Sequence, residues 1–300
     1  MRQFLLVFAA VLGVLGVLEP RLAAQKEGQL FIKIVGPDGK AVEDLKAGDV
    51  SVTEDGAACK TVKVEPIDWP MKLQVLVDNG KVTTNPINPL RDGLAALFDL
   101  IPEGVEVSMY TTAPQPRPIA KPTTDKPQLL KAIALIAPDS GAGAFFDALS
   151  EAATRTDKDK APHFPVILMV GSDFGVSNVR DRDYQQLQNN VIKHGMTVHI
   201  IVASGGAGSG ASGGVIQTEV GLALTKLSGG RYENITTGTR LATLLPEFGK
   251  RIAESHAKQK NQFRVTYERP AGKPAKPGTQ VGASVSRPGS VTLTIDGHMP

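Results

Sequence analysis

The fold is decided by an apolar run that ends in an acidic residue and a turn, Leu73-Gln74-Val75-Leu76-Val77-Asp78-Asn79-Gly80. A strand that is apolar on both faces is typical of the centre of a parallel sheet, where helices cover each side. An acidic side chain at the carboxyl end of such a strand points into the crevice where open α/β sheets bind ligands. The sequence therefore predicts that residues 73–77 form the central strand and that Asp78 lies at a ligand site.

Around this stretch, the chain alternates between predicted strands and amphipathic helices from residue 71 to residue 259. Residues 165–170 and 197–202 are two further apolar runs, and residues 105–110 alternate as a strand near a sheet edge does. Prolines on either side of Ile119 restrict any strand there to the edge. Helices are predicted at residues 88–101, 125–136, 144–154, 181–193, 215–227 and 241–252. This order predicts a doubly wound, mostly parallel, Rossmann-like α/β sheet with helices on both faces.

The two ends of the mature chain have a different pattern. Residues 25–70 and 260–300 contain short runs that alternate between apolar and polar residues, separated by turn signals such as Pro37-Asp38-Gly39-Lys40. Few strands are predicted at either end, and a sheet of so few strands is marginally stable alone. We therefore expect the two segments to pair with each other as a small antiparallel β domain beside the α/β domain of residues 71–259.

The first 24 residues predict an export signal. Arg2 provides a positive charge, residues 4–18 are mostly apolar, and Leu22-Ala23-Ala24 provides small residues for cleavage before Gln25. The mature protein is then periplasmic or extracellular with no stable membrane span, and a retained, uncleaved anchor is the alternative. The single cysteine, Cys59, excludes a disulfide within the chain and leaves a bridge between chains open.

Composition and motifs argue against several function classes. The chain has 33 basic and 30 acidic residues, a balance that argues against a nucleic-acid binder. Gly208-Ser209-Gly210-Ala211-Ser212-Gly213 matches a dinucleotide-binding pattern, but its loop is too long for the tight turn which that site needs. Asp173-Phe174-Gly175 lacks the other kinase motifs. The five histidines show no metal-ligand spacing, and His199 is expected in the core. An exported enzyme is therefore the less favoured alternative.

Three groups of stretches carry a family resemblance. Residues 36–42 with 49–56 precede the α/β region, Phe146-Asp147-Ala148-Leu149 begins a helix within it, and residues 263–267 with 286–289 follow it. In this combination the chain resembles the bacterial von Willebrand factor type A (VWFA)-related proteins over most of its mature length. The resemblance implies a type A-like α/β domain between two β segments.

The resemblance also implies a divalent-cation site, the metal-ion-dependent adhesion site (MIDAS), above the central strand. Asp78 matches its first aspartate. The positions of two serines fall on Gly80 and Val82, that of the threonine on Gly143, and that of the second aspartate on Gly171. A hard cation needs about six oxygen ligands, so we expect a degenerate site and no cofactor. The alternative is a cation held by nearby oxygens, namely those of Thr83, Thr84, Ser140, Ser172 and Asp173.

The sequence thus predicts an exported, non-catalytic binding module of the adhesion type. Its partner is expected to be another protein or a component of the cell envelope, bound by loops at the carboxyl edge of the sheet. The alternative function is a metal-dependent (Mg²⁺, Mn²⁺ or Ca²⁺) adhesion domain with unusual ligands around Asp78. The candidate binding residues are Asp78, Asn79, Gly80, Thr83, Ser140, Ser172 and Asp173.

Overall fold

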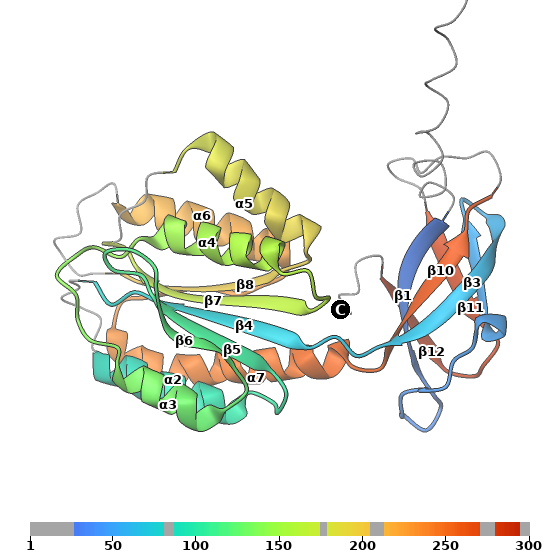
Figure 1. Cartoon of the computed structure of the whole chain (residues 1–300), viewed down its shortest axis with the longest axis horizontal. Helices are drawn as coiled ribbons and strands as arrows, with labels where there is room; N and C mark the ends of the chain where they lie inside the picture. The colour runs from blue at the N-terminus through green and yellow to red at the C-terminus, as the bar shows by residue number, and fades with distance from the viewer. Residues whose placement is uncertain (1–26, 81–86, 175–178, 205–212, 271–279, 295–300) are drawn as a thin grey trace, which may run out of the picture. The chain divides into compact units, whose positions relative to one another are not determined.

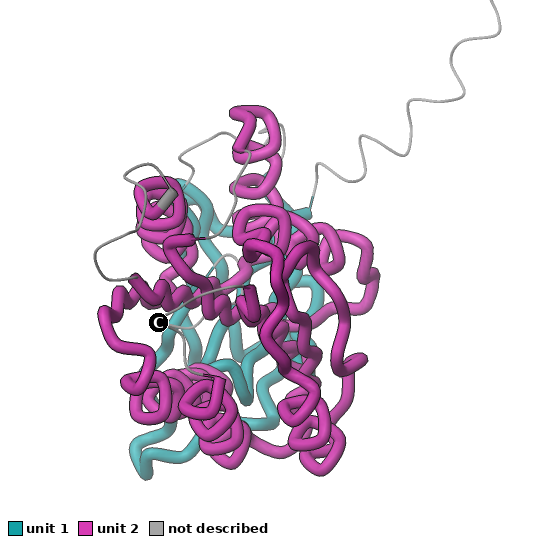
Figure 2. Tube along the Cα trace, turned by 90° about the vertical axis from the view of Figure 1, so that its left-hand side faces the viewer, with its two compact units in different colours: residues 1–68, 259–300 teal, residues 69–258 magenta. Residues whose placement is uncertain are grey.

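The computed structural model describes residues 27–80, 87–174, 179–204, 213–270 and 280–294. The chain divides into two compact units: Met1–Asp68 with Gln259–Pro300, called the β unit, and Trp69–Lys258, called the α/β unit (Figure 2). The predicted export signal, residues 82–84 and residues 208–212 of the glycine motif lie outside the described residues. Within the described ranges, no helix is both long and apolar enough to cross a membrane.

The α/β unit is built on one six-stranded sheet with the strand order β6-β5-β4-β7-β8-β9. Five strands run parallel, and β6 pairs antiparallel with β5 at one edge. The prediction of a mostly parallel sheet with an edge strand near Ile119 is therefore confirmed. The strands are β4 (Met71–Val77), β5 (Glu106–Thr111), β6 (Arg117–Thr123), β7 (Phe164–Ser172), β8 (Thr197–Ala203) and β9 (Tyr232–Ile235).

Helices cover both faces of this sheet, as the apolar strands require. In Figure 1, α4, α5 and α6 lie on one face, and α2, α3 and α7 lie on the other. The buried side chains of α4, α5 and α6 form one core with those of β7 and β8. The helices are α2 (Ile87–Leu100), α3 (Lys126–Ala134), α4 (Phe145–Lys158), α5 (Asp181–Lys193), α6 (Gly213–Ser228) and α7 (Leu241–Gln259).

The predicted C-terminal ends of two helices are wrong: α4 and α7 continue beyond residues 154 and 252, to Lys158 and Gln259. Helix α2 begins at Ile87, one residue before the predicted start, and Pro89 lies within its first turn, where backbone N–H groups have no partner in the helix. Helix α5 begins at Asp181 and ends at Lys193, as its predicted range has it. Helix α4 continues to Lys158, a turn beyond the predicted end, because Thr156 is buried and packing against the sheet extends the helix.

His199 lies in the core, as the sequence predicts. Its Nδ1 accepts a hydrogen bond from the backbone N–H of Arg231 at 3.0 Å, and its ring meets Phe248 edge-on. Burial lowers the pKa of His199 to about 3, with the charges of Arg251 and Arg231 acting in the same direction. The imidazole is therefore neutral at physiological pH and supports packing between β8 and α7.

The β unit is a six-stranded antiparallel sheet with the order β11-β2-β3-β10-β1-β12. Strand β10 lies between β1 and β3, so the predicted pairing of the two chain ends is confirmed. The half-buried Cys59 is on β3, and burial raises the pKa of its thiol. The strands are β1 (Glu27–Val35), β2 (Val50–Glu54), β3 (Ala57–Ile67), β10 (Gln262–Glu268), β11 (Val281–Val285) and β12 (Ser290–Thr294).

Candidate functional site at the carboxyl edge of the sheet

The carboxyl ends of β4, β5 and β7 meet at one edge of the α/β sheet. Hydrogen bonds continue beyond the strands there: the N–H of Asp78 donates to Val170 O at 2.8 Å, and the N–H of Thr112 donates to Val77 O at 3.0 Å. The loop before α4 joins the same edge, because the N–H of Ala144 donates to Thr112 O at 3.0 Å. This arrangement brings Asp78 to the centre of three chain segments.

Both carboxylate oxygens of Asp78 accept hydrogen bonds from the protein. Oδ1 accepts from the N–H of Gly80 at 2.8 Å, and Oδ2 accepts from the Ser172 hydroxyl at 2.6 Å. The side chain is buried, with 2% of the residue exposed. Burial raises the pKa of Asp78, and the bonds from Ser172 and Gly80 partly oppose that rise. The carboxylate is thus enclosed and turned toward protein donors.

Gly143 lies directly against this carboxylate. A Cβ atom at Gly143 would be 2.4 Å from Cγ, Oδ1 and Oδ2 of Asp78. A Cβ atom at Gly80 would be 2.7 Å from the carbonyl oxygen of Gly141 and 2.9 Å from the nitrogen of Gly143. Such distances are shorter than real Cβ contacts, so both positions accept glycine alone without a shift of the backbone. The loop of residues 141–143 therefore fills the space next to Asp78.

Gly171 is enclosed in a different way. A Cβ atom there would lie 2.8 Å from the ring of Phe145, which is fully buried at the start of α4. An aspartate at this position would have to displace the aromatic ring. Gly171 therefore belongs to the packing between β7 and α4.

The described residues around Asp78 do not fit the cation that the family resemblance implies. Mg²⁺ and similar ions need about six oxygen ligands in an open cavity. Gly80, Gly143 and Gly171 supply no side-chain oxygen, and the loop backbone fills the space beside the remaining carboxylate. Among the residues that the structure describes, no group of three or more His, Cys, Asp or Glu side chains could hold a metal ion.

Asn79 connects the carboxyl edge to the neighbouring loops. Its side-chain amide donates to Ala137 O at 2.8 Å, its Oδ1 accepts from the N–H of Ala113 at 3.2 Å, and its backbone carbonyl accepts from the N–H of Asp139 at 2.7 Å. Asp139, which the sequence did not single out, then accepts from the N–H of Gly141 at 2.8 Å. The only signal for this turn was the order of an aspartate, a serine and a glycine.

The remaining predicted site residues lie in different environments. Ser140 is exposed at the tip of the loop, whereas Ser172 and Asp173 are buried at the end of β7. The N–H of Asp173 donates to Ala203 O at 3.1 Å, which links β7 to β8. Thr83 lies outside the described residues. The structure therefore brings Asp78, Asn79, Gly80 and Ser172 together and leaves Ser140 facing solvent.

No protein-family model and no curated protein matches this chain. The solved structures similar to it include the conserved hypothetical protein BatB from Bacteroides thetaiotaomicron. That protein is 13% identical with a TM-score of 0.47, and the match covers 62% of this chain and 100% of that one. The von Willebrand factor type A protein from Catenulispora acidiphila is 11% identical with a TM-score of 0.48, over 90% of this chain and 72% of its own.

A third similar structure is proximal thread matrix protein 1 from the mussel byssus, with a zinc-occupied MIDAS motif. It is 13% identical with a TM-score of 0.48, and the match covers 67% of this chain and 48% of that one. At such identities the likeness concerns the fold alone. The ligand chemistry of the α/β unit must therefore be derived from its own side chains.

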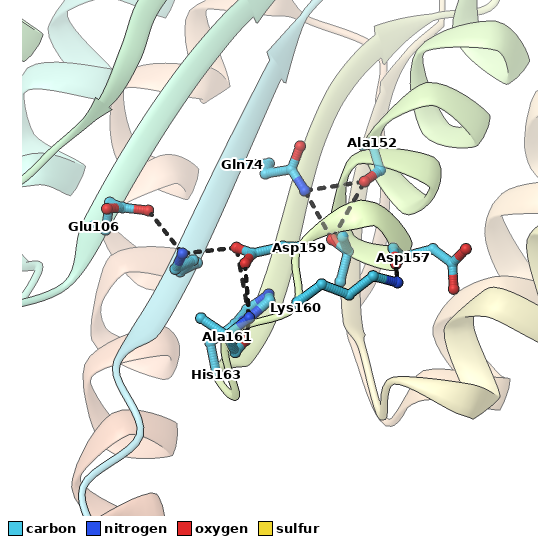
Figure 3. A network of polar contacts seen from close by, with 10 residues as sticks. Gln74, Glu106, Ala152, Asp157, Asp159, Lys160, Ala161 and His163 are labelled. Atoms are coloured by element: carbon cyan, nitrogen blue, oxygen red, sulfur yellow. Dashed lines mark hydrogen bonds and ion pairs between the residues drawn. The ribbon is translucent and has the colours of Figure 1, made fainter.

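A second polar cluster lies at the opposite, amino end of the α/β sheet (Figure 3). Lys72 on β4 places its Nζ 2.7 Å from Asp159 and 3.4 Å from Glu106 on β5. The hydrogen bond from Lys72 lowers the pKa of Asp159, and burial opposes this shift. Nδ1 of His163 lies 2.7 Å from Ala161 O. These charges pair with one another, so the cluster joins β4, β5 and the end of α4 and is not a ligand site.

Proposed function

We propose that the protein is an exported, non-catalytic module that binds another protein or a cell-envelope component through the carboxyl edge of its α/β unit. One observation carries the proposal. The loop of residues 137–143 is hydrogen-bonded to the sheet through Asn79 and presents Ser140 and Ala142 to solvent. Exposed loops on a rigid scaffold are where binding residues are concentrated.

The state of Asp78 supports a function without catalysis. A general acid or base must reach the proton that it transfers, within about 3 Å of a substrate atom. The oxygens of Asp78 instead accept from Gly80 and Ser172, and the residue is almost completely buried. The same enclosure supports binding without a cation.

Site-specific photo-crosslinking tests the proposed binding edge. A photoreactive residue at Ser140 should give an adduct of defined mass in cells that naturally express the protein. A photoreactive residue at Glu103 is the matched control, because Glu103 is exposed in the loop before β5, at the other end of the sheet. Equal labelling from both positions, or no adduct from Ser140, would contradict the proposal.

Calorimetry tests whether the proposed binding is independent of metal ions. Titration of the protein with Mg²⁺, Mn²⁺ or Ca²⁺ should give no saturable heat, because the loop backbone fills the space beside Asp78. Micromolar binding that disappears in Asp78→Ala would instead establish a metal-dependent adhesion domain.

Export depends on the predicted leader, residues 1–24. Mass spectrometry of the mature protein should find Gln25 as its first residue. A mature chain that still begins at Met1 would contradict cleavage.

A further inference from the structure

We infer that Asn79 is a positioning residue. Its hydrogen bonds, and not a bound cation, hold the loop of residues 137–143 against the ends of β4 and β5. The role in binding rests on the proposed function above, whereas the positioning of the loop can be measured without a partner. The edge would then be assembled permanently and would respond neither to divalent ions nor to their removal.

The contacts of Asn79 reach three separate chain segments. The residue follows β4, Ala113 follows β5, and Ala137 and Asp139 belong to the loop before α4. Asn79 is 7% exposed, so water competes little for these bonds. One side chain and its backbone carbonyl therefore cross-link all three segments.

Contacts other than those with Asn79 hold the rest of the loop. Asp139 accepts from the N–H of Gly141, and Gly141 packs so closely on Pro114 that a Cβ atom would lie 2.6 Å from the Cβ of the proline. Gly143 rests on the Asp78 carboxylate, and Ala144 bonds to Thr112. Ser140 and Ala142 are exposed between these fixed points.

Asp78 and Asn79 bond to chain segments on different sides of β4. The two oxygens of Asp78 are occupied by Gly80 and by Ser172, so Asp78 joins β4 to β7. The amide of Asn79 faces the loop before α4 and the end of β5. The hydrogen bonds that tie the loop to the ends of β4 and β5 are therefore those of Asn79, and Ser172→Ala should leave them in place.

Hydrogen–deuterium exchange of the full chain tests this assignment. In the wild-type protein, peptides covering residues 110–116 and 137–146 should exchange at the same rate in EDTA and in millimolar Mg²⁺. In Asn79→Ala, exchange in both peptides should rise about tenfold or more, since buried hydrogen bonds are lost. Asn189→Ala, a change of an exposed asparagine on α5, is the matched control and should leave both peptides unchanged.

Asn79→Asp separates the two side-chain bonds. The carboxylate keeps an acceptor for the N–H of Ala113 but has no donor for Ala137 O. Exchange should therefore rise more in residues 137–146 than in residues 110–116. If Asn79→Ala does not fold, the inference is still tested by Asn79→Asp and by the exchange of the wild-type protein in EDTA and in Mg²⁺.

Two results would overturn the inference: slower exchange of residues 137–146 when Mg²⁺ is added to the wild type, or unchanged exchange in both Asn79 variants. Failure of the proposed function has a different signature. Absence of crosslinking from Ser140 together with the expected exchange rates would remove the binding role of the edge and retain Asn79 as its positioning residue.

Discussion

At the scale of single residues, the carboxyl edge depends on glycine positions that leave no room for a side chain. Gly143→Ala places a methyl group 2.4 Å from the Asp78 carboxylate, so the loop or the carboxylate must move. We expect the free energy of unfolding to fall by about 1–3 kcal/mol, the range for an overpacked site. Urea denaturation of the purified variant measures this change.

Gly48→Ala is a suitable control for this substitution. A Cβ atom at Gly48 meets nothing within 4 Å, so the change should have little effect on stability. Equal effects of the two substitutions would show that the contact between Gly143 and Asp78 does not constrain the loop.

The buried carboxyl of Asp78 predicts a dependence of stability on pH. Burial raises the pKa of Asp78 above the ordinary value of 3.8. The protonated acid therefore favours folding below that value, and this contribution is lost as the pH rises through the folded-state pKa. Asp78→Asn removes the titration, so its stability relative to the wild type should increase from pH 4 to pH 7. Urea denaturation across this range provides the test, and a relative decrease would contradict the prediction.

The sequence identifies the glycines at this edge, but it does not reveal that the loop backbone fills the space beside Asp78. Gly80, Gly143 and Gly171 could be recognised as positions without ligands once the resemblance had been aligned. Their close contacts depend on how the loop of residues 141–143 approaches Asp78, and glycine has no side chain whose pattern reports such an approach. For the same reason, the sequence nominated Asn79 without revealing the three segments that it joins.

At the scale of elements, α4 and α5 are joined at their C-terminal ends by one carboxylate. Oδ1 of Asp157 lies 2.7 Å from Lys193 Nζ and 2.8 Å from His194 Nε2. Hydrogen bonds from Lys193 and then His194 lower the pKa of Asp157 to about 2. The contribution of this group to stability is thus present above the unfolded-state pKa of 3.8 and is lost as the pH falls through about 2.

Asp157→Asn should therefore lower the melting temperature near neutral pH, and the difference from the wild type should shrink toward pH 2. The effect should be small and sensitive to salt, because the pair is exposed to solvent. Asp92→Asn, a change of an exposed aspartate on α2, is the control. Differential scanning calorimetry at several pH values can detect the trend, and a difference that grows on acidification would refute it.

Strands were easier to predict than helix ends for a physical reason. The buried runs of β4, β7 and β8 have apolar patterns that sheet burial imposes directly. Helix ends depend on contacts that are distant in sequence. The last turn of α4 contains Arg155, whose guanidinium lies 3.8 Å above the Tyr110 ring and bonds to Gln74. No local pattern near residue 155 identifies those partners.

At the scale of the whole molecule, the β unit requires both ends of the chain. Strand β10 supplies the pairing that connects β1 to β3, and Arg287 forms ion pairs with Asp44 and Asp49. The N-terminal segment therefore cannot complete its sheet until the C-terminal segment has been synthesised. The α/β unit, in contrast, is one continuous stretch of chain, Trp69–Lys258.

Each unit also has a core of its own, which predicts separable stability. Leu168 on β7 and Ile32 on β1 are both completely buried, one in each unit. Replacement of either by alanine should cost about 2–5 kcal/mol in its own unit. Hydrogen exchange should then accelerate in the sheet of the α/β unit for Leu168→Ala and in the β unit for Ile32→Ala, because each cavity weakens the core that contains it. Matched acceleration of both units in either variant would mean that the chain unfolds as one cooperative body.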